Sequence, residues 1–152
     1  MESLVECSSR ALRKGVNYWE KHAPLVSWRT IGFSFTIALL RGWQTRQVDF
    51  VQAYPQAPVE CDIYMSIPKG YMIKGASHGS HVIKLVKNLY GQKQAGRVWN
   101  KHLNAGLMKI RFKPSLIDPC IYYKRNVVIL VYVDDGIFLS PSNKSIDNAI
   151  QE

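Results

Sequence analysis

The spacing of apolar side chains along the chain predicts two helices. Residues 27–43 (SWRTIGFSFTIALLRGW) place apolar side chains around most of a helical cylinder, with Ser27 as a favourable N-cap and Gly42 where a C-terminal glycine is expected. Such a broad apolar surface indicates a helix that packs on more than one side. Residues 95–112 (AGRVWNKHLNAGLMKIRF) have apolar side chains at positions 99, 103, 107 and 110, and this helical period predicts the second helix.

The remaining apolar runs predict β-strands. Strand signals lie around residues 47–51, in the alternating residues 61–68 and, after a predicted turn at 75–81, in residues 81–91. Three more runs, at residues 120–124, 127–132 and 137–140, predict a meander. Its tight turns are predicted at Arg125-Asn126 and at Asp135-Gly136. This order of elements predicts an α+β fold, in which an antiparallel sheet has helices packed on one face.

Composition narrows the class of protein. The 152 residues are enough for about one domain, and the apolar fraction of 47% is that of a globular chain. The 20 basic residues exceed the 11 acidic ones by 9, which favours a polyanionic partner, either nucleic acid or an anionic membrane surface. No apolar run approaches the roughly 20 residues of a membrane helix, and neither a signal peptide nor a metal-ligand spacing of cysteines occurs. We therefore expect an intracellular chain, in cytoplasm or nucleus, that is not secreted and has no membrane partner.

The run VVILVYVDDGIFLS at residues 127–140 sets two adjacent carboxylates, Asp134 and Asp135, between apolar segments. One interpretation is a solvated turn at the tip of a hairpin. The other is a cation site, because two like charges about 4 Å apart repel by about 1 kcal/mol in water and by more at a lower dielectric. Asp49, the sole acid of residues 26–58, is the candidate third ligand, although by itself it is better explained as a strand-end residue that caps a loop. Three carboxylates would suit Mg²⁺, which prefers hard oxygen ligands.

Five blocks of sequence resemble, in order, the polymerase of copia-type LTR retrotransposons, a family of reverse transcriptases. The blocks are GVNYWEKHAPLVSW (15–28), QVDFVQAYPQAPVECDIYMSIPKGY (47–71), LVKNLYGQKQAGRVWNKHL (85–103), FKPSLIDPCIYYK (112–124) and the YVDD hairpin (132–135). The resemblance extends over residues 15–140, and the agreement of five blocks in family order makes it specific.

The resemblance assigns candidate site residues by position. Asp49, Asp134 and Asp135 match the catalytic, metal-binding aspartates. The resemblance groups Phe50 with them as a metal-site residue, and its backbone matches the place that faces the nucleotide triphosphate. Tyr54 matches the aromatic gate beneath the incoming sugar, which excludes a 2′-hydroxyl. The alternative interpretation of Tyr54 is an ordinary packed tyrosine. The nucleotide-binding block contributes Gln92, Lys93 and Gln94, and the candidate contacts to nucleic acid are Lys87, Arg97 and Tyr132. For the two basic residues, solvated side chains are an equally good interpretation.

These assignments imply nucleotidyl transfer. A primer 3′-hydroxyl would attack the α-phosphate of a deoxynucleoside triphosphate, and pyrophosphate would leave, with two Mg²⁺ ions, or Mn²⁺ in their place, as cofactors. The implied partners are an RNA or DNA template with its primer and deoxynucleoside triphosphates. The sequence does not indicate an oligomeric state.

The chain also departs from the family pattern. Gln92 stands where the family usually has leucine, and Gly96 where it has proline. Residues 1–14 are expected to be an irregular remnant of the fingers, residues 15–140 a partial palm and residues 141–152 a truncated tail. Because fingers and thumb are largely missing, we expect the isolated chain to be inactive. Two alternatives stay open: a non-catalytic nucleic-acid-binding or interaction remnant of a transposable element, and an unrelated Mg²⁺-dependent phosphotransfer enzyme.

Overall fold

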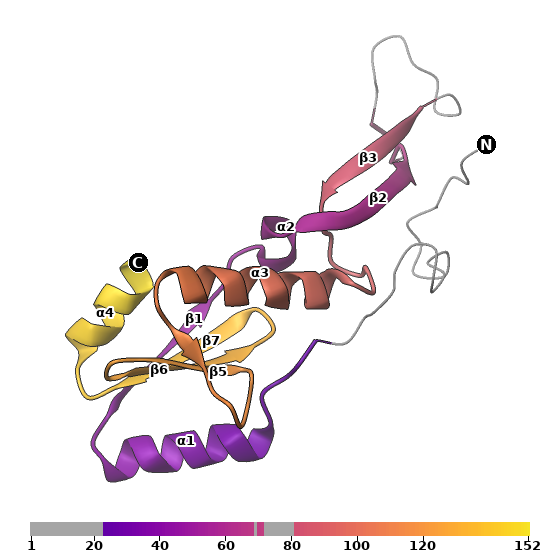
Figure 1. The fold of residues 1–152 in the computed structure, drawn as a ribbon. Helices are drawn as coiled ribbons and strands as arrows, with labels where there is room; N and C mark the ends of the chain where they lie inside the picture. The colour runs from indigo at the N-terminus through magenta and orange to yellow at the C-terminus, as the bar shows by residue number, and fades with distance from the viewer. Residues whose placement is uncertain (1–22, 69, 72–80) are drawn as a thin grey trace. The chain divides into compact units, whose positions relative to one another are not determined.

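A computed structural model describes residues 23–68, 70–71 and 81–152 of the chain. The chain divides into two compact units, whose elements are drawn in Figure 1. The sheet unit contains Ala23–Ala53 and Asn100–Glu152, and the hairpin unit contains the described part of Tyr54–Trp99. The irregular segment expected at residues 1–14 and most of the turn expected at 75–81 lie outside the described residues.

The sheet unit is built on a five-stranded antiparallel sheet in the order β1-β7-β6-β5-β4. Its strands are β1 (Gln44–Asp49), β4 (Lys113–Pro114), β5 (Ile121–Lys124), β6 (Val127–Tyr132) and β7 (Asp135–Ser140). Strands β5, β6 and β7 form the predicted meander. Strand β1 joins the edge of this meander beside β7, so that two segments far apart in the sequence lie side by side.

Helices cover both faces of this sheet. One face packs against α1 (Trp28–Leu40) in a cluster whose buried members are Val26, Ala38, Cys120, Leu130 and Leu139. The other face packs against α4 (Asn143–Gln151) and the later part of α3 (Ala95–Lys109), with a buried cluster formed by Leu107, Phe112, Tyr122, Val127, Ile129, Val131, Phe138 and Ile146.

The prediction of helices on one face is therefore wrong. Successive residues of a strand point to opposite faces of the sheet. Leu130 and its neighbour Val131 are both buried, as are Phe138 and its neighbour Leu139. The two central strands thus present large apolar side chains on each face, and both faces need a covering layer.

Helix α1 begins and ends as the sequence predicts. At its start, the hydroxyl oxygen of Ser27 accepts a hydrogen bond from the backbone N–H of Thr30 at 3.1 Å. Just past its end, Gly42 adopts the left-handed φ of +63°, and the N–H of Trp43 donates to the carbonyl oxygen of Ala38 at 2.8 Å. This is a Schellman motif, in which glycine is favoured because it has no Cβ.

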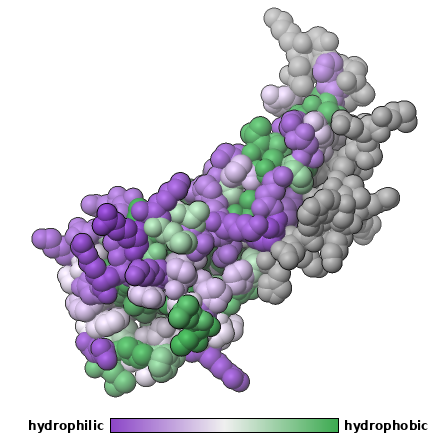
Figure 2. All heavy atoms as spheres, in the orientation of Figure 1, coloured by the Kyte–Doolittle hydropathy of each residue, from purple (hydrophilic) through white to green (hydrophobic). Residues whose placement is uncertain are grey.

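The outer surface of α1 is apolar. Its exposed large side chains, with the neighbouring Leu25, are Trp28, Phe33, Leu39 and Leu40. Figure 2 shows hydrophobic side chains reaching the surface at the lower edge of the view, where Figure 1 places this helix. Within the described part of the chain the helix is therefore packed on one side, not on several as predicted. None of the helices in residues 23–68, 70–71 and 81–152 is both long and apolar enough to span a bilayer.

The hairpin unit contains most of the short helix α2 (Ala53–Gln56), the paired strands β2 (Pro58–Ser66) and β3 (Val82–Lys87), and the first turn of α3. Asn88, which follows β3, is fully buried. Its side-chain Nδ2 donates to the carbonyl oxygens of Ala57 and Pro58, at 3.0 and 2.8 Å. These bonds hold the end of β3 against the start of β2.

The last hairpin differs from its prediction. Tyr132 pairs with Asp135, so the loop consists of Val133 and Asp134, while Asp135 and Gly136 begin β7. The turn predicted at Asp135-Gly136 is therefore wrong, because pairing with β1 draws both residues into the sheet. The Arg125-Asn126 turn is confirmed by the pairing of Lys124 with Val127. The expected tail contains helix α4, whose Ile146 is completely buried.

Candidate functional site

Two of the three predicted catalytic aspartates face each other across neighbouring strands. Asp49 of β1 is the direct partner of Asp135 of β7. Directly opposed residues in an antiparallel pair lie on the same face, with Cβ atoms about 4.5–5.5 Å apart. Asp49 is exposed and Asp135 is half-buried. The sheet thus brings together two carboxylates that are 86 residues apart in the chain (135 − 49).

The third aspartate, Asp134, lies in the turn that joins β6 to β7. Its carbonyl oxygen accepts a hydrogen bond from the backbone N–H of Phe50 at 2.7 Å, which ties the end of β1 to this turn. Val133 has a left-handed φ of +57°, which β-branched residues rarely adopt. Such strain costs about 1–3 kcal/mol and persists where the surroundings hold it, most often at functional sites.

Polar and aromatic side chains adjoin the facing aspartates. Gln47 donates from Nε2 to Oδ1 of Asp135 at 3.0 Å, which orients that carboxylate. Tyr132, the partner of Asp135 on β6, is 37% exposed, and its ring centroid lies 6.2 Å from that of Trp28. The sequence did not identify Gln47 or Trp28, because it does not reveal the register of β1 on β7 or which face α1 covers.

The described residues do not contain a closed metal site. Within residues 23–68, 70–71 and 81–152, no three His, Cys, Asp or Glu side chains lie close enough together to hold an ion. The donor chemistry nevertheless fits a hard divalent cation, which binds carboxylate oxygens and keeps several waters. Like charges directly opposed on two strands destabilise the pairing, and a bound cation would remove that repulsion. The residues that could hold such an ion are Asp49 and Asp135, which face each other, and Asp134 in the adjoining turn.

The ring of Phe50 packs against Gly136. A Cβ built on residue 136 would lie 3.2 Å from both Cε2 and Cζ of that ring, closer than ordinary van der Waals contact. Glycine therefore allows Phe50 to pack directly on the strand that follows the aspartates. Of the Phe50 backbone, predicted to face the nucleotide triphosphate, the N–H donates to the carbonyl oxygen of Asp134.

In the hairpin unit, two of the predicted nucleotide-binding residues are buried. Gln92 and Gln94 are 7% and 3% exposed, whereas Lys93 is exposed. The side-chain oxygen of Gln92 accepts a hydrogen bond from the N–H of Leu89 at 3.2 Å. Among the described residues, Nε2 of Gln92 and both amide atoms of Gln94 have no hydrogen-bond partner. These amides are therefore not presented at the surface.

The predicted phosphate contacts have partners within the hairpin unit. The Lys87 ammonium donates to the carbonyl oxygen of Gln56 at 2.8 Å, and Arg97 forms an ion pair with Glu60. Tyr54, the predicted gate, stacks against Tyr90 with ring centroids 4.5 Å apart.

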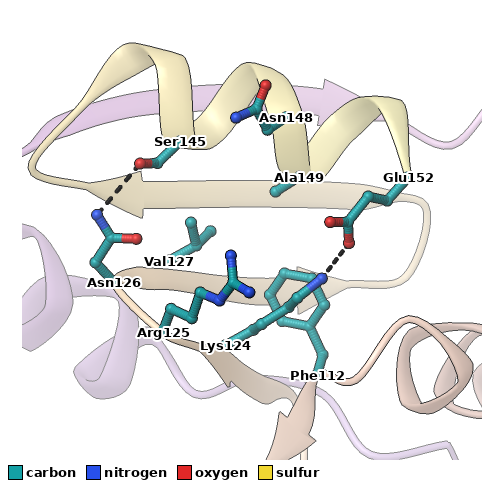
Figure 3. A pocket seen from close by; sticks show the side chains of 9 residues that line it. All are labelled: Phe112, Lys124, Arg125, Asn126, Val127, Ser145, Asn148, Ala149 and Glu152. Atoms are coloured by element: carbon teal, nitrogen blue, oxygen red, sulfur yellow. Dashed lines mark hydrogen bonds and ion pairs between the residues drawn. The ribbon is translucent and has the colours of Figure 1, made fainter.

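A pocket of the sheet unit lies at the opposite end of β6 from the aspartates (Figure 3). The β5–β6 turn contributes Arg125 and Asn126, and α4 contributes Asn148. Two contacts join its walls: Lys124 pairs with Glu152, and Asn126 donates to the Ser145 hydroxyl at 3.2 Å. None of the predicted site residues lines it. The pocket is therefore separate from the candidate site.

The helices and the antiparallel sheet are consistent with part of a reverse transcriptase domain. The chain belongs to the reverse transcriptase (RNA-dependent DNA polymerase) family, which matches residues 7–152 and thus every described residue. Within that family, its relatives include retrovirus-related Pol polyproteins of copia-type plant transposons. The resemblance inferred from the five sequence blocks is confirmed.

Three relatives show how much of their own length the chain matches. The Pol polyprotein from transposon RE1 of Arabidopsis thaliana is 37% identical over 127 residues, which are 81% of this chain and 8% of that protein. The Pol polyprotein from transposon TNT 1-94 of Nicotiana tabacum is 32% identical over 132 residues, 84% of this chain and 10% of that protein. A putative transposon Ty5-1 protein of Saccharomyces cerevisiae is 31% identical over 109 residues, 69% of this chain and 35% of that protein. The chain thus spans a tenth or less of the two plant polyproteins. No solved structure matches it.

Proposed function

We propose that the chain supplies the carboxylates of the nucleotidyl-transfer centre of a copia-type reverse transcriptase, and that the sheet unit is part of its palm. The pairing of Asp49 with Asp135, next to Asp134 in the turn, carries the proposal. Two like charges directly opposed on neighbouring strands reduce stability. Their presence is explained if a cation binds between them.

In this proposal Asp49, Asp134 and Asp135 would hold two Mg²⁺ ions, or Mn²⁺ in their place. Such ions, when bound, lower the pKa of an attacking hydroxyl and neutralise charge on a leaving pyrophosphate. Gln47 keeps the Asp135 carboxylate oriented through its 3.0 Å hydrogen bond. The N–H of Phe50 holds the turn that carries Asp134 in place through its bond to the carbonyl oxygen of that residue.

The proposed substrates are an RNA or DNA template with its primer and deoxynucleoside triphosphates. Tyr54 would lie beneath the incoming sugar and reject a 2′-hydroxyl. The proposed nucleotide-binding residues are Gln92, Lys93 and Gln94, with the backbone of Phe50, and the proposed nucleic-acid contacts are Lys87, Arg97 and Tyr132. The match of the reverse transcriptase family to residues 7–152 and the net charge of +9 support these assignments.

Cation binding by the isolated chain tests the carboxylate site without requiring turnover. Titration with Mn²⁺, followed by electron paramagnetic resonance of the free ion, is expected to show binding that Asp49→Asn and Asp134→Asn each weaken at least tenfold. Asp62→Asn is the matched control, because Asp62 is an exposed aspartate of β2 paired with Lys84. Equal Mn²⁺ binding by the chain and both site variants would refute the proposed metal site.

Primer extension on an RNA template with Mg²⁺ tests the chemistry. Any incorporation is expected to disappear in Asp134→Asn and to survive in Asp62→Asn. Equal incorporation by the unchanged chain and Asp134→Asn would contradict the catalytic assignment. The alternative is a non-catalytic nucleic-acid-binding remnant, which the excess of basic residues supports. It would be favoured by salt-dependent binding to an RNA–DNA hybrid that occurs without incorporation and is unaffected by Asp134→Asn.

A further inference from the structure

Tyr54 has an aromatic neighbour that the family resemblance does not assign. The ring of Tyr90 lies against it, with centroids 4.5 Å apart and the planes tilted by 32°. This geometry is within the range of favourable aromatic pairs. Tyr54 is half-buried, whereas Tyr90 is 55% exposed. Burial therefore does not explain why Tyr90 is held in this position.

The backbone around Tyr90 forms a tight turn. The N–H of Gln92 donates to the carbonyl oxygen of Leu89 at 3.3 Å, and Gly91 has a φ of +91°. A positive φ at the third residue is typical of a type II turn and favours glycine. The side-chain oxygen of Gln92 accepts a second bond, at 3.2 Å, from the N–H of Leu89. The turn that presents Tyr90 is thus closed by both the backbone and the side chain of one residue.

The two tyrosines are also joined through the backbone. Asn88, directly before the turn, donates from its side chain and its backbone N–H to the carbonyl oxygen of Ala57. The N–H of Ala57 in turn donates to the carbonyl oxygen of Tyr54 at 3.1 Å. The turn of Tyr90 and the helical turn of Tyr54 are therefore fixed to the same backbone segment. Their ring contact follows from this framework rather than from loose surface packing.

We propose that Tyr90 is a positioning residue for Tyr54, and that Gln92 acts by holding the turn of Tyr90. This inference rests on the proposed role of Tyr54 beneath the incoming sugar. A ring that rejects a 2′-hydroxyl does so sterically, so its selectivity depends on how little it can move. The ring contact with Tyr90 limits the movement of the Tyr54 ring. Gln92, found where the family usually has leucine, adds a hydrogen bond to the turn.

Nucleotide selection measures this role directly. Equilibrium binding of dATP and ATP to the full chain, with Mg²⁺ and a template–primer, gives the ratio of the two affinities. We expect Tyr90→Ala to reduce this preference for dATP about two- to tenfold, the range of an aromatic pair interaction. Tyr90→Phe retains the ring and is expected to restore the preference. Tyr54→Ala is expected to abolish it, and adding Tyr90→Ala to that variant should cause no further change.

Two controls separate positioning from general loss of structure. Tyr123→Ala removes a similarly exposed tyrosine, 45% exposed on β5, and should leave the ratio unchanged. Gln92→Leu removes the side-chain bond of the turn together with an amide proposed to bind nucleotide. It should lower the ratio of the dATP and ATP affinities, and not merely both affinities alike, while urea unfolding still shows a cooperative transition. If Tyr90→Ala does not fold, Gln92→Leu tests the positioning role instead.

The outcomes distinguish this inference from the function on which it rests. If Tyr54→Ala loses the preference while Tyr90→Ala and Gln92→Leu retain it, the positioning role is overturned and the role of Tyr54 stands. If the unchanged chain shows no preference for dATP, the proposed role of Tyr54 is overturned, and the inference about Tyr90 is overturned with it.

Discussion

The ring of Phe50 packs against the backbone of Gly136, with two ring carbons 3.2 Å from the place where a Cβ would stand. The backbone N–H of Phe50 simultaneously bonds the carbonyl oxygen of Asp134 at 2.7 Å. One residue after β1 therefore contacts the turn and the strand of the β6–β7 hairpin at once. This double contact fixes the position at which Asp49 meets the other aspartates.

A side chain at residue 136 should therefore conflict with the Phe50 ring. We expect Gly136→Val to lower the free energy of unfolding by about 1–3 kcal/mol, the usual range for overpacking. The same substitution in a Phe50→Ala background should have a smaller effect, because the ring that it meets is gone. Urea unfolding of the four chains gives the coupling energy. Equal losses in both backgrounds would show that the two residues do not interact.

The facing aspartates should repel each other when no divalent ion is present. In the presence of a chelator, Asp49→Asn is expected to raise the free energy of unfolding by about 0.2–1 kcal/mol. Asp147→Asn is the control, because it removes the partner of Arg46 and should not stabilise the chain. Added Mn²⁺ should stabilise the unchanged chain more than Asp49→Asn, since only the former retains the full site. Thermal unfolding with and without Mn²⁺ measures both effects.

The left-handed backbone of Val133 should be relieved by residues that tolerate it. With φ at +57°, Val133→Gly and Val133→Asn are each expected to raise the free energy of unfolding by about 1 kcal/mol. Val128→Gly, on the same hairpin but within β6, should lower it instead. Urea unfolding compares the three variants. A loss of stability in both Val133 variants would mean that the valine side chain contributes more than the strain costs.

The bonds of Asn88 should make it important for the hairpin unit. Asn88→Ala leaves the carbonyl oxygens of Ala57 and Pro58 without these side-chain donors. We expect the free energy of unfolding to fall by about 2–4 kcal/mol. Asn126→Ala, at an exposed turn, should cost less than about 1 kcal/mol. Hydrogen exchange of the amides of β2 and β3 reports the loss within the unit. Unchanged protection of these amides in Asn88→Ala would refute the expectation.

Alkaline pH should weaken the sheet unit through two buried groups. Burial, with Asp118 close by, raises the pKa of the Cys120 thiol from 9.0 to about 11, and burial raises the pKa of Tyr122 from 10.0 to about 12. The unfolded chain therefore loses these protons at lower pH than the folded chain, so the free energy of unfolding should fall as pH rises from about 9 to about 12.

Variants of the same two residues test the alkaline effect. Cys120→Ala and Tyr122→Phe should each reduce the fall in the free energy of unfolding between pH 9 and pH 11, whatever their stability at pH 8. Tyr123→Phe, a neighbouring exposed tyrosine, should leave it unchanged. Urea unfolding at a series of pH values gives the slopes. Identical slopes in all four chains would rule out these groups as the cause.

The sequence predicted most local elements because their signals are local. The cap of α1 at Ser27 and its end at Gly42 depend on residues within one turn, and the Arg125-Asn126 turn on its two flanking strands. The β6–β7 turn could not be placed in the same way. Its position depends on the pairing of β7 with β1 and on the Phe50 ring over Gly136, neither of which is a local property.

The residues of the candidate site also differ in whether local sequence could identify them. Asp49, Asp134 and Asp135 could be identified from motifs, and the structure places two of them opposite each other. Gln47 could not be found, because an exposed glutamine in a strand has no distinguishing pattern before the register is known. Tyr90 could be named only as a motif residue, since its contact with Tyr54 depends on two turns 36 residues apart (90 − 54).

The place of β1 at the edge of the sheet has a consequence for the order of folding. The β5–β6–β7 meander joins neighbours in sequence and can form early, because closing short loops costs little entropy. Strand β1 must then wait for β7, which follows the other strands of this sheet in the chain, before it acquires a partner. Asp49 and Asp135 therefore meet only at the end of this process. While residues 50–134 are being synthesised the two charges stay apart, and the repulsion between them arises in the same step that pairs β1 with β7.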